Sequence, residues 1–170
     1  MNLIPSNLYK EMLINLPILC VDVYIYNEST KKFLLVKRNN EPEKDKFCCT
    51  GGRVLKGEDL YKAMCRKVTE ELGMKIKEGK LVLFGVTNTE FKNSIYSSVG
   101  SHTTNVSFLY IVNQESDLKI KLGGVESGEV QWKAGEEKEV VEFVRLTIKK
   151  LKQNIDANVD FNALYVNFRQ

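Results

Sequence analysis

The densest group of chemically capable side chains lies within residues 51–74. A glycine pair, Gly51-Gly52, precedes a turn, and a stretch with helical spacing of apolar residues follows it. Glu70 and Glu71 are adjacent carboxylates in that stretch, and Glu58 lies near its start. Carboxylate oxygens are hard ligands of the kind that Mg²⁺ accepts, and glycine lets backbone approach a ligand closely. The pattern therefore indicates a divalent metal that bridges phosphate oxygens.

A helix predicted from Glu58 to Leu72 must position these carboxylates. Arg66 stands one turn before Glu70 and can pair with it, and Gly73 is a typical stop signal. The apolar residues at helical spacing form one stripe to be buried, namely Leu60, Ala63, Met64, Val68 and Leu72.

The remaining elements are predicted from periodicity and from turn residues. A short helix is expected from Ser6 to Leu16, capped by Ser6, and a long amphipathic helix from Gly135 to Gln153. A loop rich in Asn, Ser and Gly is expected over residues 88–101, and the aromatic tail after Asn154 is expected to pack. Strands are expected over residues 18–26, 33–37, 47–50, 80–86, 103–112 and 129–132. This order predicts one α/β domain over residues 1–170, with a mixed sheet covered by helices on both faces.

Composition excludes several classes of protein. The 170 residues are 43% hydrophobic and 28% charged, which is typical of a globular domain. A net charge of +3 is too small to suggest nucleic-acid binding, and no apolar run approaches the ~18 residues of a membrane span. One His and four Cys without CxxC spacing argue against structural zinc. Free thiols indicate a reducing cytoplasm as the expected location.

The glycine loop and helix resemble the Nudix box. That pattern runs Gly, five residues, Glu, seven residues, Arg-Glu-apolar-any-Glu-Glu-any-Gly-apolar. The positions of this chain that fall on it are Gly52, Glu58, Arg66, Val68, Glu70, Glu71, Gly73 and Met74. The resemblance implies an α/β/α sandwich around a mixed sheet with a loop-helix metal site. It also implies that the Gly51 carbonyl, Glu70 and Glu71 are metal ligands, and that Arg66 with Glu58 holds the loop to the helix.

One position departs from the box, which expects Glu where this chain has Lys67. An ammonium group there reduces the negative charge that gathers cations. We therefore expect fewer metal ions than a fully acidic box holds, with one Mg²⁺ as the simplest case and Mn²⁺ as a substitute. An ion pair between Lys67 and Glu71 is expected, and direct contact of Lys67 with phosphate is the alternative. The substitution also removes a usual candidate for the general base.

Beyond the box, the chain is similar to the GDP-mannose mannosyl hydrolase branch. The similarity is carried by Leu16-Pro17, the strand with Asp22, Lys37-Arg38-Asn39, Gly51-Gly52-Arg53-Val54 and Phe84-Gly85-Val86. This resemblance implies hydrolysis of a nucleotide sugar to a nucleoside diphosphate and a free sugar. Attack would occur at the anomeric carbon with inversion, whereas ordinary Nudix enzymes attack phosphorus.

The resemblance also implies roles for individual side chains. Arg38 and Arg53 are expected to help the metal absorb charge on the departing diphosphate. Asp22 and Asn105 are expected to contact substrate, together with the two arginines.

The family's base is a His at the position of Asn105, and an amide cannot accept a proton at neutral pH. The general base is therefore left open, with Glu126 and Glu129 as candidates and Glu90 as a weaker one. His102 lies three residues before Asn105, on the opposite face of a strand, and is expected to serve only if a bend intervenes.

Three functions remain open at this stage. The first is nucleotide-sugar hydrolysis of the mannosyl hydrolase kind. The second is a Nudix pyrophosphohydrolase that attacks phosphorus, in which Glu126 or Glu129 restores the missing base. The third is a catalytically weak protein that binds a nucleotide. In each case the expected partner is a small nucleotide diphosphate, without nucleic acid or membrane, and a homodimer is expected from the family and from the apolar ends.

Overall fold

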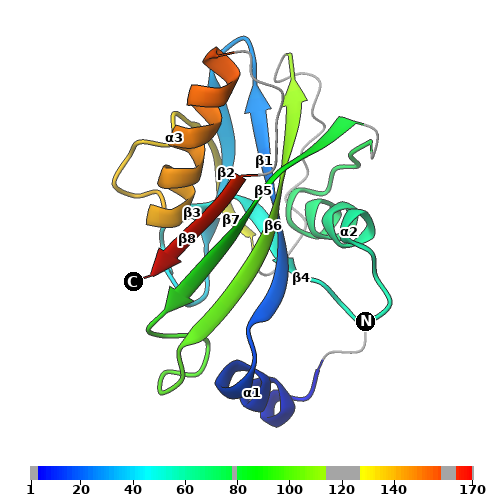
Figure 1. The fold of residues 1–170 in the computed structure, drawn as a ribbon, viewed down its shortest axis with the longest axis vertical. Helices are drawn as coiled ribbons and strands as arrows, with labels where there is room; N and C mark the ends of the chain where they lie inside the picture. Colours follow the sequence, from blue (N-terminus) through cyan, green and yellow to red (C-terminus); the bar gives the residue numbers. More distant parts are fainter. Residues whose placement is uncertain (1–3, 78–79, 114–126, 158–163, 170) are drawn as a thin grey trace.

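The computed structural model describes residues 4–77, 80–113, 127–157 and 164–169. Over these residues a mixed sheet lies between helices α2 and α3, and α1 lies at one end of the sheet (Figure 1). The helices are α1 (Ser6–Asn15), α2 (Leu60–Leu72) and α3 (Glu142–Asp156). The strands are β1 (Ile18–Asn27), β2 (Lys32–Arg38), β3 (Phe47–Cys48), β4 (Thr50–Arg53), β5 (Leu81–Phe91), β6 (Ser101–Val112), β7 (Ser127–Lys133) and β8 (Leu164–Arg169).

Strand β1 is the centre of the sheet. The described strands follow the order β3-β2-β1-β6-β5-β8, while β4 pairs with β1 and β7 pairs with β2. Parallel pairing of β1 with β6 places Asp22 opposite Ser107 and Cys20 opposite Asn105. Antiparallel pairing of β1 with β4 places Asp22 opposite Gly51. The register therefore brings Asp22, the glycine pair and β6 together at one end of the sheet.

Alternation along β1 divides the core into two layers, because successive side chains of a strand point to opposite faces. Val21, Val23 and Ile25 pack against the apolar stripe of α2. Tyr24 and Tyr26 pack on the other face against α3, whose contributions include Phe143, Val144, Ile148 and Leu151. Two buried layers on one sheet confirm the α/β/α sandwich expected from the sequence.

Helix α1 covers the end of the sheet where β1 begins. Leu13 packs there on Ile18 and Cys20, and Tyr9 and Tyr96 lie beside them. Ser6 does not cap this helix, contrary to expectation: Pro5 holds the capping position, and no side chain caps the N-terminus. The Ser6 hydroxyl instead forms a hydrogen bond with the Tyr96 hydroxyl at 2.8 Å, which ties α1 to the loop between β5 and β6.

Two helix starts differ from the predicted ones. Helix α2 begins at Leu60, because the Asp59 carboxylate accepts from the Lys62 amide at 2.8 Å and acts as its N-cap. Glu58 therefore precedes the helix. Helix α3 begins at Glu142 and not at Gly135, because Val140 forms a bridge with Phe47.

The second half of the sheet is longer than predicted. Strand β5 continues past Val86 to Phe91, because residues 87–91 pair with the start of β6. The predicted loop therefore shrinks at both ends, since β6 itself begins at Ser101. In the tail, the backbone of β8 pairs with β5 in parallel, and the packing expected of the tail's aromatic side chains lies outside the described residues. None of the described helices is long and apolar enough to cross a membrane.

Two leucines of α3 test this arrangement. Leu151 is 1% exposed and Leu146 is 41% exposed on the same helix. We expect Leu151→Ala to lower the free energy of unfolding by about 2–5 kcal/mol, because it leaves a cavity under the sheet. Leu146→Ala is the matched control and should cost less than about 1 kcal/mol. Urea unfolding followed by circular dichroism measures both, and equal losses would contradict the layer assignment.

Candidate active site

Arg66 joins the glycine loop to α2. Its Nε donates to Glu58 Oε1 at 2.6 Å, and its Nη2 donates to Glu58 Oε2 at 2.8 Å and to the Arg53 carbonyl at 2.9 Å. The Arg66 guanidinium lowers the pKa of Glu58, and Glu58 raises the pKa of Arg66. The role predicted for this pair, holding the loop to the helix, has its geometric basis in these three contacts.

Lys67 lies between the two predicted carboxylate ligands. Its Nζ is 3.0 Å from Glu71 Oε1 and 3.3 Å from Glu70 Oε2, so the expected ion pair with Glu71 is present. Glu70 also lies 3.3 Å from Arg66 Nη1. The Lys67 side chain is only 8% exposed, and its methylene arm passes over Gly52.

The glycine pair provides the space that these groups occupy. A Cβ at Gly51 would meet the Val21 carbonyl and would lie 2.5 Å from Asp22 Oδ1. A Cβ at Gly52 would lie 2.9 Å from Lys67 Cε, and its φ of +153° further disfavours a side chain. Asp22 and Lys67 can therefore approach this loop only because both positions are glycine.

Asp22 and Asn105 form a buried polar pair on neighbouring strands. Asn105 Nδ2 donates to Asp22 Oδ2 at 2.9 Å, and the residues are 7% and 4% exposed. Burial raises the pKa of Asp22 to about 7; the charge of Glu71 adds to the rise, and the hydrogen bond from Asn105 opposes it. Within the described structure, Asn105 Oδ1 has no hydrogen-bond partner. It is therefore an acceptor that a bound hydroxyl or amide could satisfy.

Two arginines flank these carboxylates from different elements. Arg38 ends β2, and its Nε donates to the Pro42 carbonyl at 2.6 Å. Arg53 ends β4, and its guanidinium carbon lies 4.1 Å from the centre of the Tyr9 ring. Tyr9 in turn packs on Tyr96, with ring centroids 6.2 Å apart. Helix α1 thus holds Arg53 through a cation–π contact.

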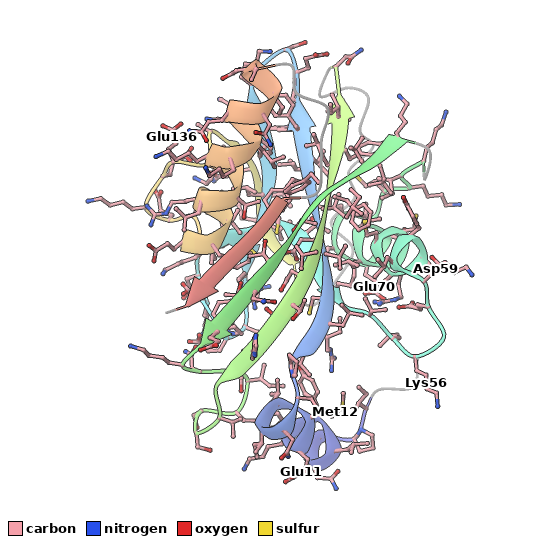
Figure 2. All side chains as sticks on the ribbon, in the orientation of Figure 1. Glu11, Met12, Lys56, Asp59, Glu70 and Glu136 are labelled. Carbon is pink, nitrogen blue, oxygen red and sulfur yellow. The ribbon has the colours of Figure 1, made fainter. Side chains whose placement is uncertain are left out.

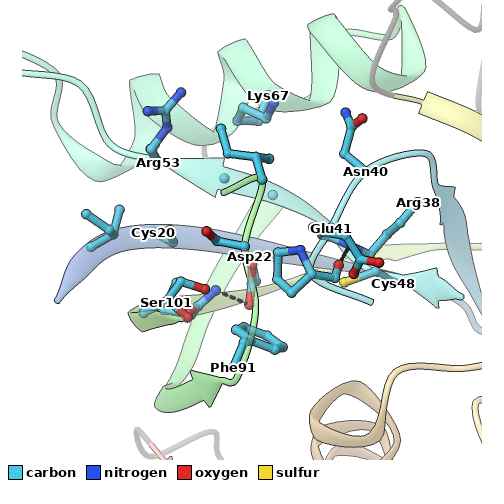
Figure 3. A pocket seen from close by; sticks show the side chains of 18 of the residues that line it. Cys20, Asp22, Arg38, Asn40, Glu41, Cys48, Arg53, Lys67, Phe91 and Ser101 are labelled. Carbon is cyan, nitrogen blue, oxygen red and sulfur yellow. Dashed lines mark hydrogen bonds between the residues drawn. The ribbon is translucent and has the colours of Figure 1, made fainter. Parts of the chain in front are cut away.

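A single cavity of about 350 Å³ joins these groups. Its lining contains seven residues predicted for the site, namely Asp22, Arg38, Gly51, Arg53, Glu70, Glu71 and Asn105. Figure 3 shows Arg53 and Lys67 on the α2 side of Asp22, and Phe91 and Ser101 on its other side. The loops at the rim are joined by Asn93 Nδ2, which donates to Glu41 Oε2 at 3.0 Å. The cavity therefore has a charged end at α2 and a mainly polar end on β1 and β6.

Of the two carboxylates predicted as bases, the structure describes only Glu129, and it does not bring that residue into this cavity. Glu126 lies outside the described residues. Glu129 is on β7, is exposed, accepts a hydrogen bond from Gln131, and does not line the cavity. His102 points away from the Asn105 face, as its spacing of three residues along a strand predicts. The position of Glu129 leaves it without contact to the predicted ligands.

Sequence reasoning missed the residues that complete the cavity from distant elements. Tyr9 comes from α1, Glu41 from the loop after β2, and Phe91 from the extended end of β5. None lies in a motif, and each is brought in by packing. The one local signal was the Asn- and Ser-rich composition of residues 88–101, which indicated a loop without showing that it borders the site.

The donor set is compatible with a divalent ion. Among the described side chains, no group of three or more His, Cys, Asp or Glu is arranged to hold a metal. Glu70, Glu71 and the Gly51 carbonyl nevertheless offer hard oxygens on one side of the cavity. Mg²⁺ is commonly held by one or two carboxylates, with water and phosphate oxygens at its other positions.

A family comparison covers most of the chain. The model described as NUDIX domain matches residues 16–161. The chain belongs to the Nudix family. The match includes the glycine loop, α2 and the strands that carry Asp22 and Asn105. It confirms the superfamily predicted from the box, and it supports a Nudix hydrolase of nucleoside diphosphate derivatives.

A curated relative matches part of the chain. A stretch of 73 residues, 43% of this Nudix chain, is 36% identical to the low-salt glycan biosynthesis protein Agl8 of Haloferax volcanii. The stretch spans 46% of that protein, about half of its length.

Solved structures share the Nudix fold. The MutT Nudix hydrolase from Burkholderia pseudomallei has a TM-score of 0.64 at 20% identity, over 79% of this chain and 98% of that one. The Nudix domain of Shewanella oneidensis NrtR, complexed with ADP ribose, has a TM-score of 0.66 at 16% identity, over 91% and 94%. A bifunctional NMN adenylyltransferase/ADP ribose pyrophosphatase from Francisella tularensis, complexed with AMP and a Mn ion, has a TM-score of 0.65 at 18% identity, over 88% of this chain and 45% of that one. At these identities the likeness shows the fold alone.

The Arg66–Glu58 pair gives a pH-dependent prediction. Glu58→Gln should lower the free energy of unfolding by about 1–3 kcal/mol near pH 7, because a charge-assisted pair is lost. The folded-state pKa of Glu58 lies below its ordinary value of 4.5, so its contribution is present above pH 4.5. It is lost as pH falls through the lowered pKa.

Urea unfolding of wild type and Glu58→Gln at about pH 7 and about pH 3 measures this effect. The difference in unfolding free energy should shrink at the lower pH. Arg66→Lys keeps the charge and removes the guanidinium fork, so it should resemble Glu58→Gln near pH 7. A difference that is constant across pH would contradict the ionic origin of the contact.

Proposed function

We propose that this Nudix chain is a Mg²⁺-dependent hydrolase of a nucleotide sugar resembling GDP-mannose, which it converts to a nucleoside diphosphate and a sugar. One observation carries the proposal: a single cavity joins the carboxylates of α2 and two arginines to the buried Asp22–Asn105 pair. The charged end suits a diphosphate, and the polar end suits sugar hydroxyls. The name of the Haloferax volcanii relative, a glycan biosynthesis protein, supports a sugar substrate.

The charged end would hold the leaving group. Mg²⁺ held by the Gly51 carbonyl, Glu70 and Glu71 would supply positive charge to the departing diphosphate. Arg38 and Arg53 present guanidinium forks, which match phosphate oxygens in two-point contacts. Both arginines are restrained, Arg38 by the Pro42 carbonyl and Arg53 by the Tyr9 ring. Little ordering remains to be done when a diphosphate binds.

The polar end would orient the sugar. Asn105 Oδ1 accepts from a sugar hydroxyl, and Asp22 holds the Asn105 amide in place through the 2.9 Å hydrogen bond. A water oxygen attacks the anomeric carbon, the bond from that carbon to the β-phosphate oxygen breaks, and its electron pair stays on the diphosphate. The proton of the water passes to a base, for which Glu126 is the proposed residue.

Attack at phosphorus is the alternative chemistry, and the cavity favours it less. That reaction needs a base beside the metal ligands, and Lys67 stands where the family pattern has a glutamate. Glu129, the described candidate for restoring that base, does not line the cavity, so Glu126 would be the base for either chemistry. Cleavage of the bond to the sugar does not require a glutamate at the position of Lys67.

The oligomeric state and the cellular location are also proposed from the sequence. We propose a homodimer in a reducing cytoplasm, with one domain over residues 1–170. The exposed apolar side chains at the α1 end agree with an interface there, namely Leu8, Ile14, Leu16 and Leu19. The four cysteines are free, as expected, and burial raises the pKa of Cys20 to about 12, which suppresses its reactivity.

The products of GDP-mannose distinguish the possible functions. Incubation with Mg²⁺ should release GDP and mannose in equal amounts, because water attacks the sugar carbon. Ion-exchange chromatography of the nucleotide and an enzymatic assay of the free sugar measure both. GMP with mannose 1-phosphate would instead establish attack at phosphorus, and binding without turnover across a panel of nucleotides would leave a binding protein.

A variant of Glu71 tests the metal assignment. Glu71→Gln should reduce Mg²⁺-dependent turnover by at least about 100-fold, because a neutral amide is a poor ligand for Mg²⁺. Glu136→Gln is the matched control on the α3 side of the molecule, away from Glu70 (Figure 2). It should keep wild-type kcat and KM. Wild-type turnover in Glu71→Gln would remove this residue from the ligand set.

A further inference from the structure

Lys67 is an unusual lysine, because it is buried within the proposed metal and diphosphate end of the cavity. Its side chain is 8% exposed and lines the cavity. Lysine is almost never buried in proteins without a partner. Here Nζ has two carboxylate partners, Glu71 at 3.0 Å and Glu70 at 3.3 Å. Close contact with both carboxylates offsets the cost of burying the ammonium group.

The position of this ammonium group is fixed by its surroundings. The methylene arm lies over Gly52, where a Cβ would come within 2.9 Å of Cε and 3.2 Å of Cδ. The backbone of α2 is held to the loop one residue earlier, where Arg66 binds Glu58 and the Arg53 carbonyl. The amine therefore lies between the two carboxylates and the glycine loop.

Charge sets a limit on what else can bind there. The cluster contains three carboxylates, Glu58, Glu70 and Glu71, against the two cations Arg66 and Lys67. One divalent ion turns the small negative excess into a small positive one, which is attractive to a diphosphate. A second divalent ion would be repelled by both the first ion and the ammonium group.

We propose that Lys67 is a built-in cation that takes the place of one divalent ion at the Glu70–Glu71 pair. The chain then binds a single metal ion, and the Lys67 ammonium group contacts a phosphate oxygen of the substrate directly. The assignment of this end to a diphosphate rests on the proposed function. The restriction to one metal ion does not, so the two parts are tested separately.

The number of metal ions is measured without nucleotide. Titration of wild type with Mn²⁺, followed by electron paramagnetic resonance of the free ion, should give one site per chain. Lys67→Glu should give two sites, because it removes the cation and adds a carboxylate ligand. Lys67→Gln should keep one site and bind Mn²⁺ roughly tenfold more tightly, since a neighbouring positive charge is gone.

Lys62→Glu is the matched control for charge. Lys62 is on the same helix, its side chain is 74% exposed, and it pairs with Asp59 outside the cavity. This variant changes the net charge by the same amount as Lys67→Glu and should keep one Mn²⁺ site. A single site in a folded Lys67→Glu, or the same change in Lys62→Glu, would overturn the proposal. Circular dichroism establishes that each variant is folded, and Lys67→Gln gives an independent reading.

Contact with phosphate is measured with inorganic pyrophosphate in the presence of saturating Mg²⁺, because the cluster attracts the anion only when the metal ion is bound. Calorimetry should detect binding to wild type, and Lys67→Met should bind at least tenfold more weakly, while Lys62→Met should bind as wild type does. Absence of wild-type binding, or equal binding by Lys67→Met, would overturn the phosphate contact. Pyrophosphate contains neither sugar nor base, and turnover is not measured. An enzyme inactive on GDP-mannose would therefore disprove the proposed function while leaving both results on Lys67 valid.

Discussion

The contacts of Arg66 hold together the part of the molecule on which the cavity depends. One guanidinium group binds both oxygens of Glu58 and the carbonyl of Arg53, and so joins three positions of the chain. Glu58 precedes α2, Arg53 ends β4, and Arg66 is in the middle of the helix. The two-point geometry requires a planar fork, which lysine does not have. With these contacts in place, the glycine loop, the carboxylates and β1 have fixed relative positions.

Close approach of backbone and side chains is the second requirement, and it explains the two glycines. Asp22 reaches the loop because Gly51 has no side chain, and Lys67 crosses the loop because Gly52 has none. Two ionisable groups of opposite type are thereby buried within the same cavity. Burial makes each costly in its charged form. Asp22 responds with a raised pKa, whereas Lys67 is compensated by two carboxylates.

The sequence predicted those features that are local in the chain. Helix α2, its apolar stripe and the ion pairs of Arg66 and Lys67 depend on spacing within about one or two helical turns, where periodicity is informative. The predicted helix starts were less accurate, because Asp59 caps α2 and leaves Glu58 outside it, and the backbone bridge at Val140 precedes α3. The extension of β5 to Phe91 depended on pairing with β6, which no local pattern encodes.

The polar end of the cavity also shows the difference between features that are local in the chain and features that depend on strand pairing. Asp22 and Asn105 were both expected to contact substrate, yet their hydrogen bond arises only because β1 and β6 are adjacent and parallel. The hydrogen bond joins residues 83 positions apart in the chain. The strand pairing that brings them together is fixed by the two apolar layers of the sheet. The same strand geometry keeps His102 out of the polar end of the cavity, because two residues three positions apart along a strand face opposite sides of the sheet. Strand alternation therefore places the Asn105 amide, and not the His102 imidazole, beside Asp22 in the cavity lining.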